Sequence, residues 1–172
     1  MDTNELVQTF LGLFDGLQNL KYGKELTVFI ISMMPILELR GGLIAAALLG
    51  LNVVPAFIIC LIGNLIPLPF ILWFITPIFN WMKKRPKIKG FVEKIENKAL
   101  SKKDKIEKKQ FWGLLLFVGI PLPGTGGWTG CLIASLLNMN KKKAMLAAFI
   151  GVILAGLIVG TFSFGLLKGI IG

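Results

Sequence analysis

The apolar residues of this chain fall into four long runs, separated by polar segments. The runs cover residues 26–51, 53–82, 111–139 and 144–167. A helix that crosses the ~30 Å hydrocarbon core of a bilayer takes about 20 mostly apolar residues. The runs 53–82 and 144–167 reach this length and contain no charged residue. The pattern therefore predicts two transmembrane helices, the first of them tilted and broken by prolines.

Prolines interrupt the other two apolar runs near their middle. Pro35 follows nine apolar residues, which make about 14 Å of helix. Pro121 and Pro123 divide the later run in the same way. Two spans and a turn do not fit into so few residues. If the later run were a single span, one of the basic segments that flank it, 83–109 or 141–143, would lie outside, against the positive-inside rule. We therefore predict re-entrant helical hairpins at 26–51 and 111–139, with breaks at these three prolines.

The two halves of the chain also resemble each other. A shift of 88 positions aligns residues 35–63 with 123–151 without gaps, and nine of the 29 pairs are identical. The informative pairs are Pro35/Pro123, Gly42/Gly130, Asn52/Asn140 and Gly63/Gly151. Each repeat then consists of a hairpin followed by a span, at 26–82 and at 111–172. One span separates the hairpins, so we expect an inverted repeat, which is a common plan of secondary transporters.

Polar segments lie at the start and in the middle of the chain. Residues 1–25 have the spacing of an amphipathic helix, which either lies in the membrane interface or packs on the rest of the protein. Of the 19 Lys and Arg residues, 12 lie between Lys83 and Lys109. Basic residues beside apolar runs are typical of cytoplasmic loops. We therefore interpret 83–110 as a cytoplasmic connector and do not expect nucleic acid as a partner, despite a net charge of +10.

Composition narrows the class of protein further. Hydrophobic residues make up 55% of the chain and charged residues 16%, with a mean hydropathy of +0.76. Soluble domains are nearer a quarter charged, so we expect an all-α integral membrane protein. The chain has no histidine, and Cys60 and Cys131 are isolated in apolar runs. We therefore expect no enzyme activity, no cofactor and no metal site.

Charged residues are rare in the first half of the predicted membrane region. Glu38 and Arg40 are the only formal charges between Leu26 and Met82. A charge in the bilayer costs a few kcal/mol even on insertion scales, so such residues usually face a cavity or each other. In a non-helical tip after Pro35, Arg40 would bind an anionic group of a substrate and Glu38 would be a proton or cation site. The alternative is a surface ion pair at the aqueous boundary.

The second predicted tip, PLPGTGGWTG at 121–130, is uncharged and rich in glycine. Glycines can aim several backbone N–H groups into one concavity, and a helix that begins near Trp128 adds its positive end. We therefore name as candidate substrate-binding residues Gly124, Thr125, Gly126, Gly127 and Trp128. The alternative is that the glycines only permit a tight turn and close helix packing.

Two motifs carry a resemblance to a known family. ELRGG at 38–42 and PLPGTGGWTG at 121–130 resemble the small multidrug export proteins, and the likeness covers most of residues 26–165. More distantly the chain resembles the DedA/VTT superfamily, which is associated with moving lipids, including polyprenyl-phosphate carriers, and with proton-dependent phenotypes. Such chains usually have further arginines in the second hairpin, which here has none. The resemblance implies a protein of a prokaryotic inner membrane.

These observations together predict a secondary transporter. We expect it to bind a small or amphipathic anionic substrate, a lipid phosphate included, between the two hairpin tips, with Glu38 as the coupling or proton site. Two spans enclose two hairpins poorly, so we expect a homodimer or a higher homo-oligomer, with membrane lipids as further partners. The alternative function is a non-transporting scaffold or lipid-binding assembly factor that uses the basic connector.

Overall fold

The computed structural model describes residues 3–14, 16, 20–101, 110–122 and 124–171, and the regular secondary structure in these residues is helical. The chain divides into two compact units, one of residues 1–66 and 152–172, the other of residues 67–151. Each unit contains one predicted hairpin, the N-terminal half of the span that follows this hairpin, and the C-terminal half of the other span. The units therefore differ from the predicted repeats 26–82 and 111–172. The reason is length, because a hairpin arm of 11 residues covers only part of a 31-residue span.

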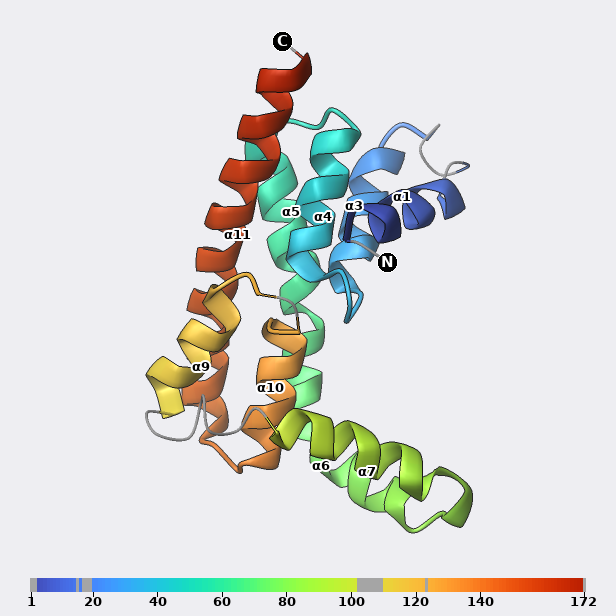
Figure 1. The fold of residues 1–172 in the computed structure, drawn as a ribbon, viewed down its shortest axis with the longest axis vertical. Helices are drawn as coiled ribbons and strands as arrows, with labels where there is room; N and C mark the ends of the chain where they lie inside the picture. Colours follow the sequence, from blue (N-terminus) through green and yellow to red (C-terminus); the bar gives the residue numbers. More distant parts are fainter. Residues whose placement is uncertain (1–2, 15, 17–19, 102–109, 123, 172) are drawn as a thin grey trace. The chain divides into compact units, whose positions relative to one another are not determined.

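In the first unit, α3 (Gly23–Met33) and α4 (Glu38–Leu48) pack against each other and against α5 (Val53–Leu65), as Figure 1 shows. The open end of this hairpin is tied together, because Lys24 Nζ donates a hydrogen bond to the Leu49 carbonyl oxygen at 3.0 Å. The buried apolar side chains of the three helices include Val28, Ile31, Leu39, Leu43, Ala46 and Ala56.

The N-terminal helix α1 (Thr3–Leu13) packs against α4 and buries Val7 completely. This contact fits the second interpretation of residues 1–25, a short helix packed on the rest of the protein. Part of the segment, residues 15 and 17–19, lies outside the described residues. A position in the membrane interface stays a prediction.

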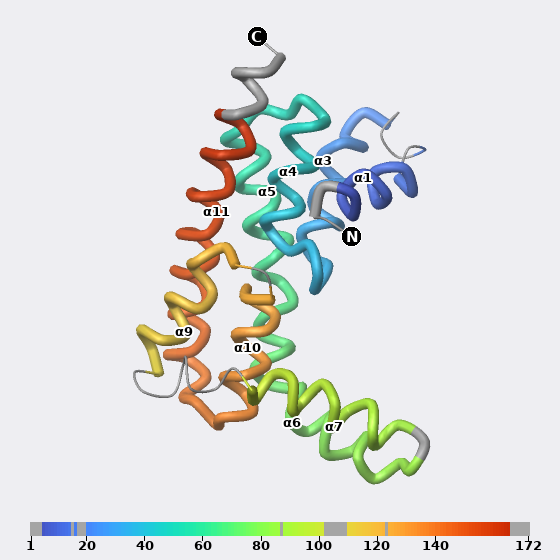
Figure 2. The backbone as a smooth tube through the Cα atoms, in the orientation of Figure 1, coloured from blue at the N-terminus to red at the C-terminus, as the bar shows by residue number. Residues whose placement is uncertain are grey.

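In the second unit, α9 (Gln110–Gly119) and α10 (Gly127–Leu136) form the later hairpin (Figure 2). The unit also contains α6 (Pro67–Lys83) and the first part of α11 (Lys141–Ile171). A polar contact joins two helices here, since the hydroxyl oxygens of Thr76 in α6 and Ser135 in α10 lie 2.8 Å apart. Isolated Ser and Thr residues commonly make such bonds between apolar helices.

The basic connector is partly helical. Helix α7 (Pro86–Leu100) begins with proline in its first turn, where the missing N–H costs nothing. It packs on α6 and α10, with Val92 and Ala99 buried, and an ion pair of 2.7 Å joins Lys83 to Glu96. The described part of the connector is therefore helical from Pro86 to Leu100, and residues 102–109 lie outside the described part of the chain.

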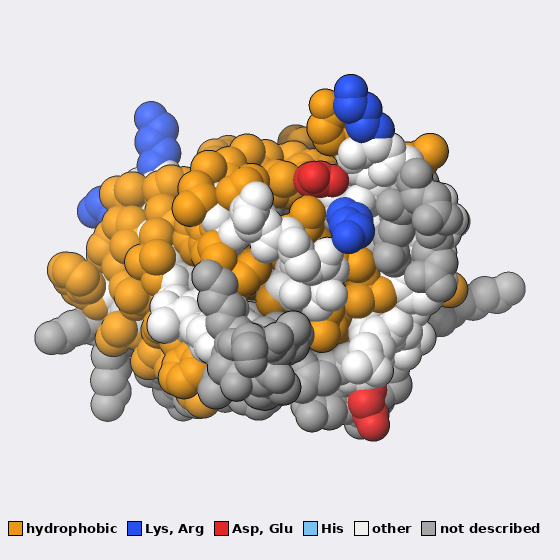
Figure 3. Space-filling model, turned by 90° about the horizontal axis from the view of Figure 1, so that it is seen from above, with side chains coloured by type: hydrophobic (Ala, Val, Ile, Leu, Met, Phe, Trp, Pro, Cys, Tyr) orange, Lys and Arg blue, Asp and Glu red, His pale blue; other side chains and the backbone are white. Residues whose placement is uncertain are grey.

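Within the described residues, two helical stretches are long and apolar enough to cross a membrane. They are Val53–Lys83, with a mean hydropathy of 2.3, and Lys141–Gly165, with 2.5. Only 33% and 39% of their apolar windows are buried inside the protein, which is low for core helices of a soluble domain. Figure 3 shows one face of the molecule, on which hydrophobic side chains cover a broad area. Length, composition and exposure together support a membrane protein.

The second arms of the two hairpins end in the same way. Both end in a Schellman motif, whose left-handed residue is Gly50 (φ 70°) after α4 and Asn138 (φ 52°) after α10. The closing backbone bonds, 3.0 Å each, run from Leu51 N to the Ala46 oxygen and from Met139 N to the Ala134 oxygen. Positions 50 and 138 are 88 residues apart, the shift that aligns the sequence repeats.

The span that follows each hairpin begins after an asparagine. Asn140 Oδ1 accepts a hydrogen bond from Lys143 N at 3.2 Å, so Asn140 caps the start of α11. Asn52 occupies the N-cap position of α5 with an extended backbone, but its side chain makes no capping bond. The repeat thus preserves the position of the cap and differs in the bond.

Two pairs of glycines make equivalent close contacts. A Cβ atom at Gly63 would lie 2.7 Å from the Phe29 carbonyl oxygen, and one at Gly151 would lie 2.8 Å from the Leu115 carbonyl oxygen. Residues 29 and 115 are 86 positions apart, whereas the glycines are 88 apart. The second tip is therefore two residues longer than the first, although the first arm of each hairpin packs on its span in the same register.

Candidate functional site

The first hairpin tip begins where α3 ends. Met34 has an extended backbone (φ −74°, ψ 139°), the conformation that a following proline favours. The turn then runs through Pro35 and Ile36 to Leu37, whose side chain is buried. Glu38 N donates to the Met34 carbonyl oxygen at 2.9 Å, which closes the turn at the start of α4.

Glu38 is both buried and conformationally strained. Its side chain is 5% exposed, and its φ of 52° lies in the left-handed region. For an L-residue this region costs roughly 1–2 kcal/mol, and glycine avoids that cost. Strained residues of this kind cluster at binding and catalytic sites. Both the burial of a carboxylate and the strain at the same residue call for a functional explanation.

Arg40 lies two residues further on, half-buried, and is close enough to Glu38 for electrostatic attraction. Residues at i and i+2 of a regular helix do not face each other. The left-handed backbone of Glu38 breaks that regularity at the first residue of α4. The expectation that both charges belong to a non-helical tip is wrong for Arg40, because α4 begins at Glu38.

The two glycines after Arg40 fix the position of this turn. A Cβ atom at Gly41 would lie 2.6 Å from Leu37 Cβ. One at Gly42 would overlap Ser32 Oγ of α3 and lie 2.9 Å from Cys60 Sγ of α5. Gly42 thus allows α4 to approach α3 and α5 closely, and Gly41 leaves room for the Leu37 side chain. This packing holds the charged first turn in place.

A further polar residue of the same unit is buried without a partner. Asn64 is 1% exposed, and its Oδ1 accepts no hydrogen bond from any described residue. An unpaired buried acceptor costs about 1–3 kcal/mol. Asn64 follows Gly63, whose Cβ position lies 3.2 Å from Ser32 Cβ in the last turn of α3. Asn64 is therefore near the level of the first tip, and its oxygen is available to a ligand or water.

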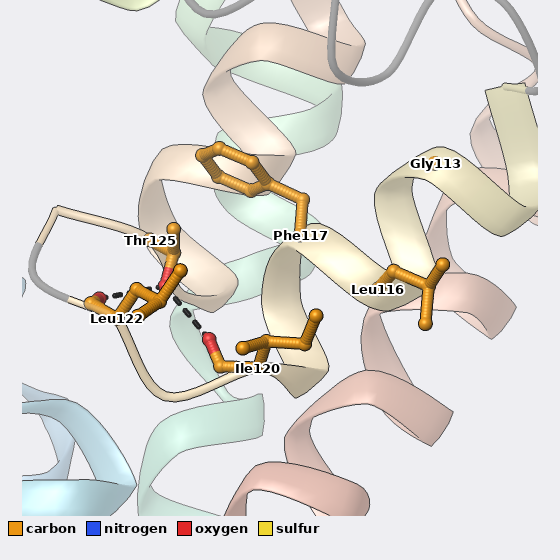
Figure 4. Close-up of a pocket in the computed structure, with 6 residues that line it drawn as sticks. All are labelled: Gly113, Leu116, Phe117, Ile120, Leu122 and Thr125. Atoms are coloured by element: carbon orange, nitrogen blue, oxygen red, sulfur yellow. Dashed lines mark hydrogen bonds between the residues drawn. The ribbon is translucent and has the colours of Figure 1, made fainter.

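Thr125 holds the second tip together. Its Oγ1 lies 2.7 Å from the Leu122 carbonyl oxygen and 3.0 Å from that of Ile120, as Figure 4 shows. Its backbone N–H also donates to Leu122, at 3.1 Å. The hydroxyl proton is therefore used within the turn.

The glycines of the second tip have conformations that side chains disfavour. Gly124 has a φ of 74°, and Gly126, the N-cap of α10, has a φ of 140° with a ψ of −179°. The latter region is essentially restricted to glycine. Helix α10 begins at Gly127, one residue from the predicted start, with Trp128 half-buried in its first turn. The need for a tight turn accounts for Gly124 and Gly126, as the alternative interpretation proposed.

An apolar pocket of about 270 Å³ lies beside this tip (Figure 4). Its walls are formed by Gly113, Leu116, Phe117, Ile120, Leu122 and Thr125. Thr125 is the only one of these residues with a polar side chain, and its hydroxyl is bonded to carbonyl oxygens of the turn. The pocket is therefore suited to hydrocarbon and not to a charged group.

The structure thus groups the predicted residues by tip. Glu38 and Arg40 share the first tip, and residues 124–128 share the second, each tip in its own unit. A substrate pocket shared by the tips stays a prediction, and Pro123 lies outside the described residues. Among the described residues, no group of three or more cysteine, aspartate or glutamate side chains is placed to hold a metal. Sequence reasoning missed Ser32 and the Thr76–Ser135 pair, whose only signal is a lone hydroxyl in an apolar run.

Comparison with known proteins gives one match. Residues 38–158, about 70% of the chain, match the profile of the family described as "Putative small multi-drug export protein". No curated protein and no solved structure matches the chain. The matched region begins at Glu38, the last residue of the first turn, and includes the ELRGG motif and the second tip.

Proposed function

Since the chain belongs to the small multi-drug export protein family, we propose that it is a secondary transporter of a small or amphipathic solute with an anionic group. In this proposal Arg40 binds the anionic group and Glu38 carries the coupling proton or cation. Asn64 adds a hydrogen-bond acceptor at the level of the same tip.

The single observation that carries the proposal is the state of Glu38. Burial of the Glu38 carboxylate, with 5% exposure, destabilises the fold by desolvation, and the left-handed backbone destabilises it further by strain. The turn itself requires neither cost, because the aligned position of the second tip is a glycine, Gly126. A buried acid that protonates when Arg40 binds an anion would couple proton movement to the solute.

The proposed transport path rests on an inverted repeat of re-entrant hairpins. The tie from Lys24 to Leu49 keeps both ends of the first hairpin at one level, as re-entry requires. The matching Schellman motifs and glycine contacts support a repeat in which each hairpin packs on the span that follows it. One span separates the hairpins along the chain, so they enter from opposite sides of the membrane.

The second tip contributes an apolar surface in this proposal. The pocket of about 270 Å³ beside Thr125 accommodates a hydrocarbon part of the substrate, whereas the charged groups lie at the first tip. Two spans enclose two hairpins poorly, so the proposed transporter is a homodimer or a higher homo-oligomer.

Proteoliposomes test this function. Purified protein is reconstituted with a pH gradient, and flux of lipid phosphates, simple organic anions and cationic dyes is measured against empty liposomes. We expect flux of an anionic solute, loss of coupling in Glu38→Gln and loss of solute affinity in Arg40→Gln. Lys94→Gln, on the exposed face of α7, is the control. Flux that is unchanged in both tip variants refutes the assigned site.

A scaffold function is the second candidate, because α7 exposes Lys89, Lys94 and Lys98 on one helix that packs on the second unit. This function predicts the reverse result in the same experiment. No flux would exceed that of empty liposomes, and removal of α7 lysines would abolish binding to a cytosolic or lipid partner, whereas tip variants would keep it.

A further inference from the structure

The second unit also contains a groove that shares no lining residue with the pocket beside Thr125. It has a volume of about 360 Å³ and is lined by Trp73 of α6 and by four residues of α11, namely Lys142, Met145, Leu146 and Phe149. We call it the lysine–tryptophan groove. No step of the proposed transport uses it.

The groove changes from cationic to apolar along α11. Met145, Leu146 and Phe149 follow Lys142 at i+3, i+4 and i+7, the spacing of one helix face. Seven residues of helix extend over about 10 Å. Leu146 is 52% exposed and Phe149 38%, so this apolar strip is not covered by the protein. A ligand that matches the strip has a charged end and a hydrocarbon chain.

The cationic end has no acidic counterpart. Lys141, Lys142 and Lys143 are exposed, and Lys141 Nζ lies 6.0 Å from the centre of the Trp73 ring. Within the part of the chain that the structure describes, ion pairs join Lys83 to Glu96 and Lys89 to Glu93, and none involves these three lysines. Their positive charge is therefore available to an anion.

The groove also lies where a bilayer would present such an anion. Lys141 to Lys143 directly precede the apolar run of α11, so they mark the boundary between headgroups and hydrocarbon. Lysine and tryptophan are both concentrated at that boundary. Phospholipids of the adjacent leaflet place their phosphates at this level and their acyl chains alongside Leu146 and Phe149.

We propose that the lysine–tryptophan groove binds one anionic phospholipid. The ammonium groups of Lys141 and Lys142 contact its phosphate, the Trp73 ring borders the headgroup, and an acyl chain lies along Leu146 and Phe149. A zwitterionic lipid fits less well because its own cation is repelled by three lysines. A second copy of this chain, with a formal charge of +10, fits poorly for the same reason.

Native mass spectrometry of the full chain in detergent tests the charge requirement. Phosphatidylglycerol and phosphatidylcholine with identical acyl chains are titrated, and the Kd of the first bound lipid is measured. The double variant K141Q/K142Q should bind phosphatidylglycerol about 30-fold more weakly, at about 1 kcal/mol per lysine. The control K94Q/K98Q removes the same charge from exposed positions of α7 and should bind like the unchanged protein. Equal losses in both variants, or equal affinity for both lipids, overturns the proposal.

A second variant tests the acyl-chain contact. Phe149→Ala should weaken binding of long-chain phosphatidylglycerol severalfold and leave binding of the dihexanoyl lipid unchanged. A loss of equal size for both lipids would show that no acyl chain lies on Phe149 and overturns the proposed orientation. Both readouts are binding constants, so their failure leaves the transport proposal standing.

Discussion

The two hairpin tips solve the same geometric problem with different residues. Each must turn the chain back and start a helix, and each uses a positive φ at aligned positions, Glu38 in the first tip and Gly126 in the second. Glycine takes such a conformation without strain, whereas glutamate does not. The second tip therefore follows the rules of turn formation, and the first departs from them at its one acidic residue.

This difference separates what the fold requires from what the function requires. Glycine at position 38 would satisfy the turn, so the fold alone does not explain a buried glutamate there. In the second tip the fold explains most of the residues, since Thr125 bonds to the turn and Gly124 and Gly126 supply its backbone. We therefore place the charged part of the site at the first tip.

The largest expected effect on stability tests the equivalence of the two halves. Gly63→Ala and Gly151→Ala each force a Cβ atom against a backbone carbonyl oxygen, 2.7 and 2.8 Å away. Backbone cannot yield as a side chain does, so each variant should lose about 2–3 kcal/mol of unfolding free energy. Thermal unfolding in detergent measures both, with Gly90→Ala, which meets no atom within 4 Å, as the control. A clear loss at only one of the two glycines contradicts equivalent packing.

A smaller effect separates the tips themselves. Glu38→Gly and Glu38→Ala both remove the carboxylate, but only glycine relieves the left-handed strain. Glu38→Gly should therefore be more stable than Glu38→Ala by about 1–2 kcal/mol. Gly126→Ala should lose stability by about the same amount, because alanine is strained at a φ of 140°. If glycine and alanine at position 38 unfold at the same temperature, Glu38 is not strained and the contrast between the tips fails.

The smallest effect concerns the helix caps. Asn140→Ala removes the bond from Oδ1 to Lys143 N and should cost about 1 kcal/mol. Asn52→Ala removes no capping bond and should cost less, although the residue occupies the aligned position. Chemical or thermal unfolding of the two single variants measures the difference. Equal losses would mean that Asn52 caps α5 in solution as Asn140 caps α11.

The positions of the helices followed from the sequence because prolines and apolar run lengths are local signals. Pro35 and Pro121 lie just after the ends of α3 and α9. The first span begins at Val53, as predicted, and the second at Lys141, three residues before the predicted start. The helix within the connector was not located from the sequence, since its many lysines leave few apolar positions to define a period, and α7 is fixed by packing on α6 and α10.

The site was only partly predictable. Rarity of charge identified Glu38 and Arg40, but the strain at Glu38 depends on a turn geometry that composition does not reveal. The glycines have two different roles, which the sequence alone did not distinguish. Gly42 and Gly63 pack helices together, whereas Gly124 and Gly126 provide backbone angles, and both uses look alike in sequence. Each compact unit contains one half of each span. This division depends on contacts between segments that are distant in the sequence, which hydrophobic periodicity does not encode.

Side-specific cysteine labelling tests the central claim, that both hairpins re-enter, and from opposite sides. Cys60 and Cys131 are first replaced, and single cysteines are placed at the exposed positions Lys24, Asn52, Gln110 and Lys142, which flank the two hairpins. The account predicts that Gln110→Cys and Lys142→Cys react with an impermeant reagent from one side of oriented vesicles, and Lys24→Cys and Asn52→Cys from the other. Reaction of Gln110→Cys and Lys142→Cys from opposite sides would show that the second hairpin crosses the membrane and would contradict the account.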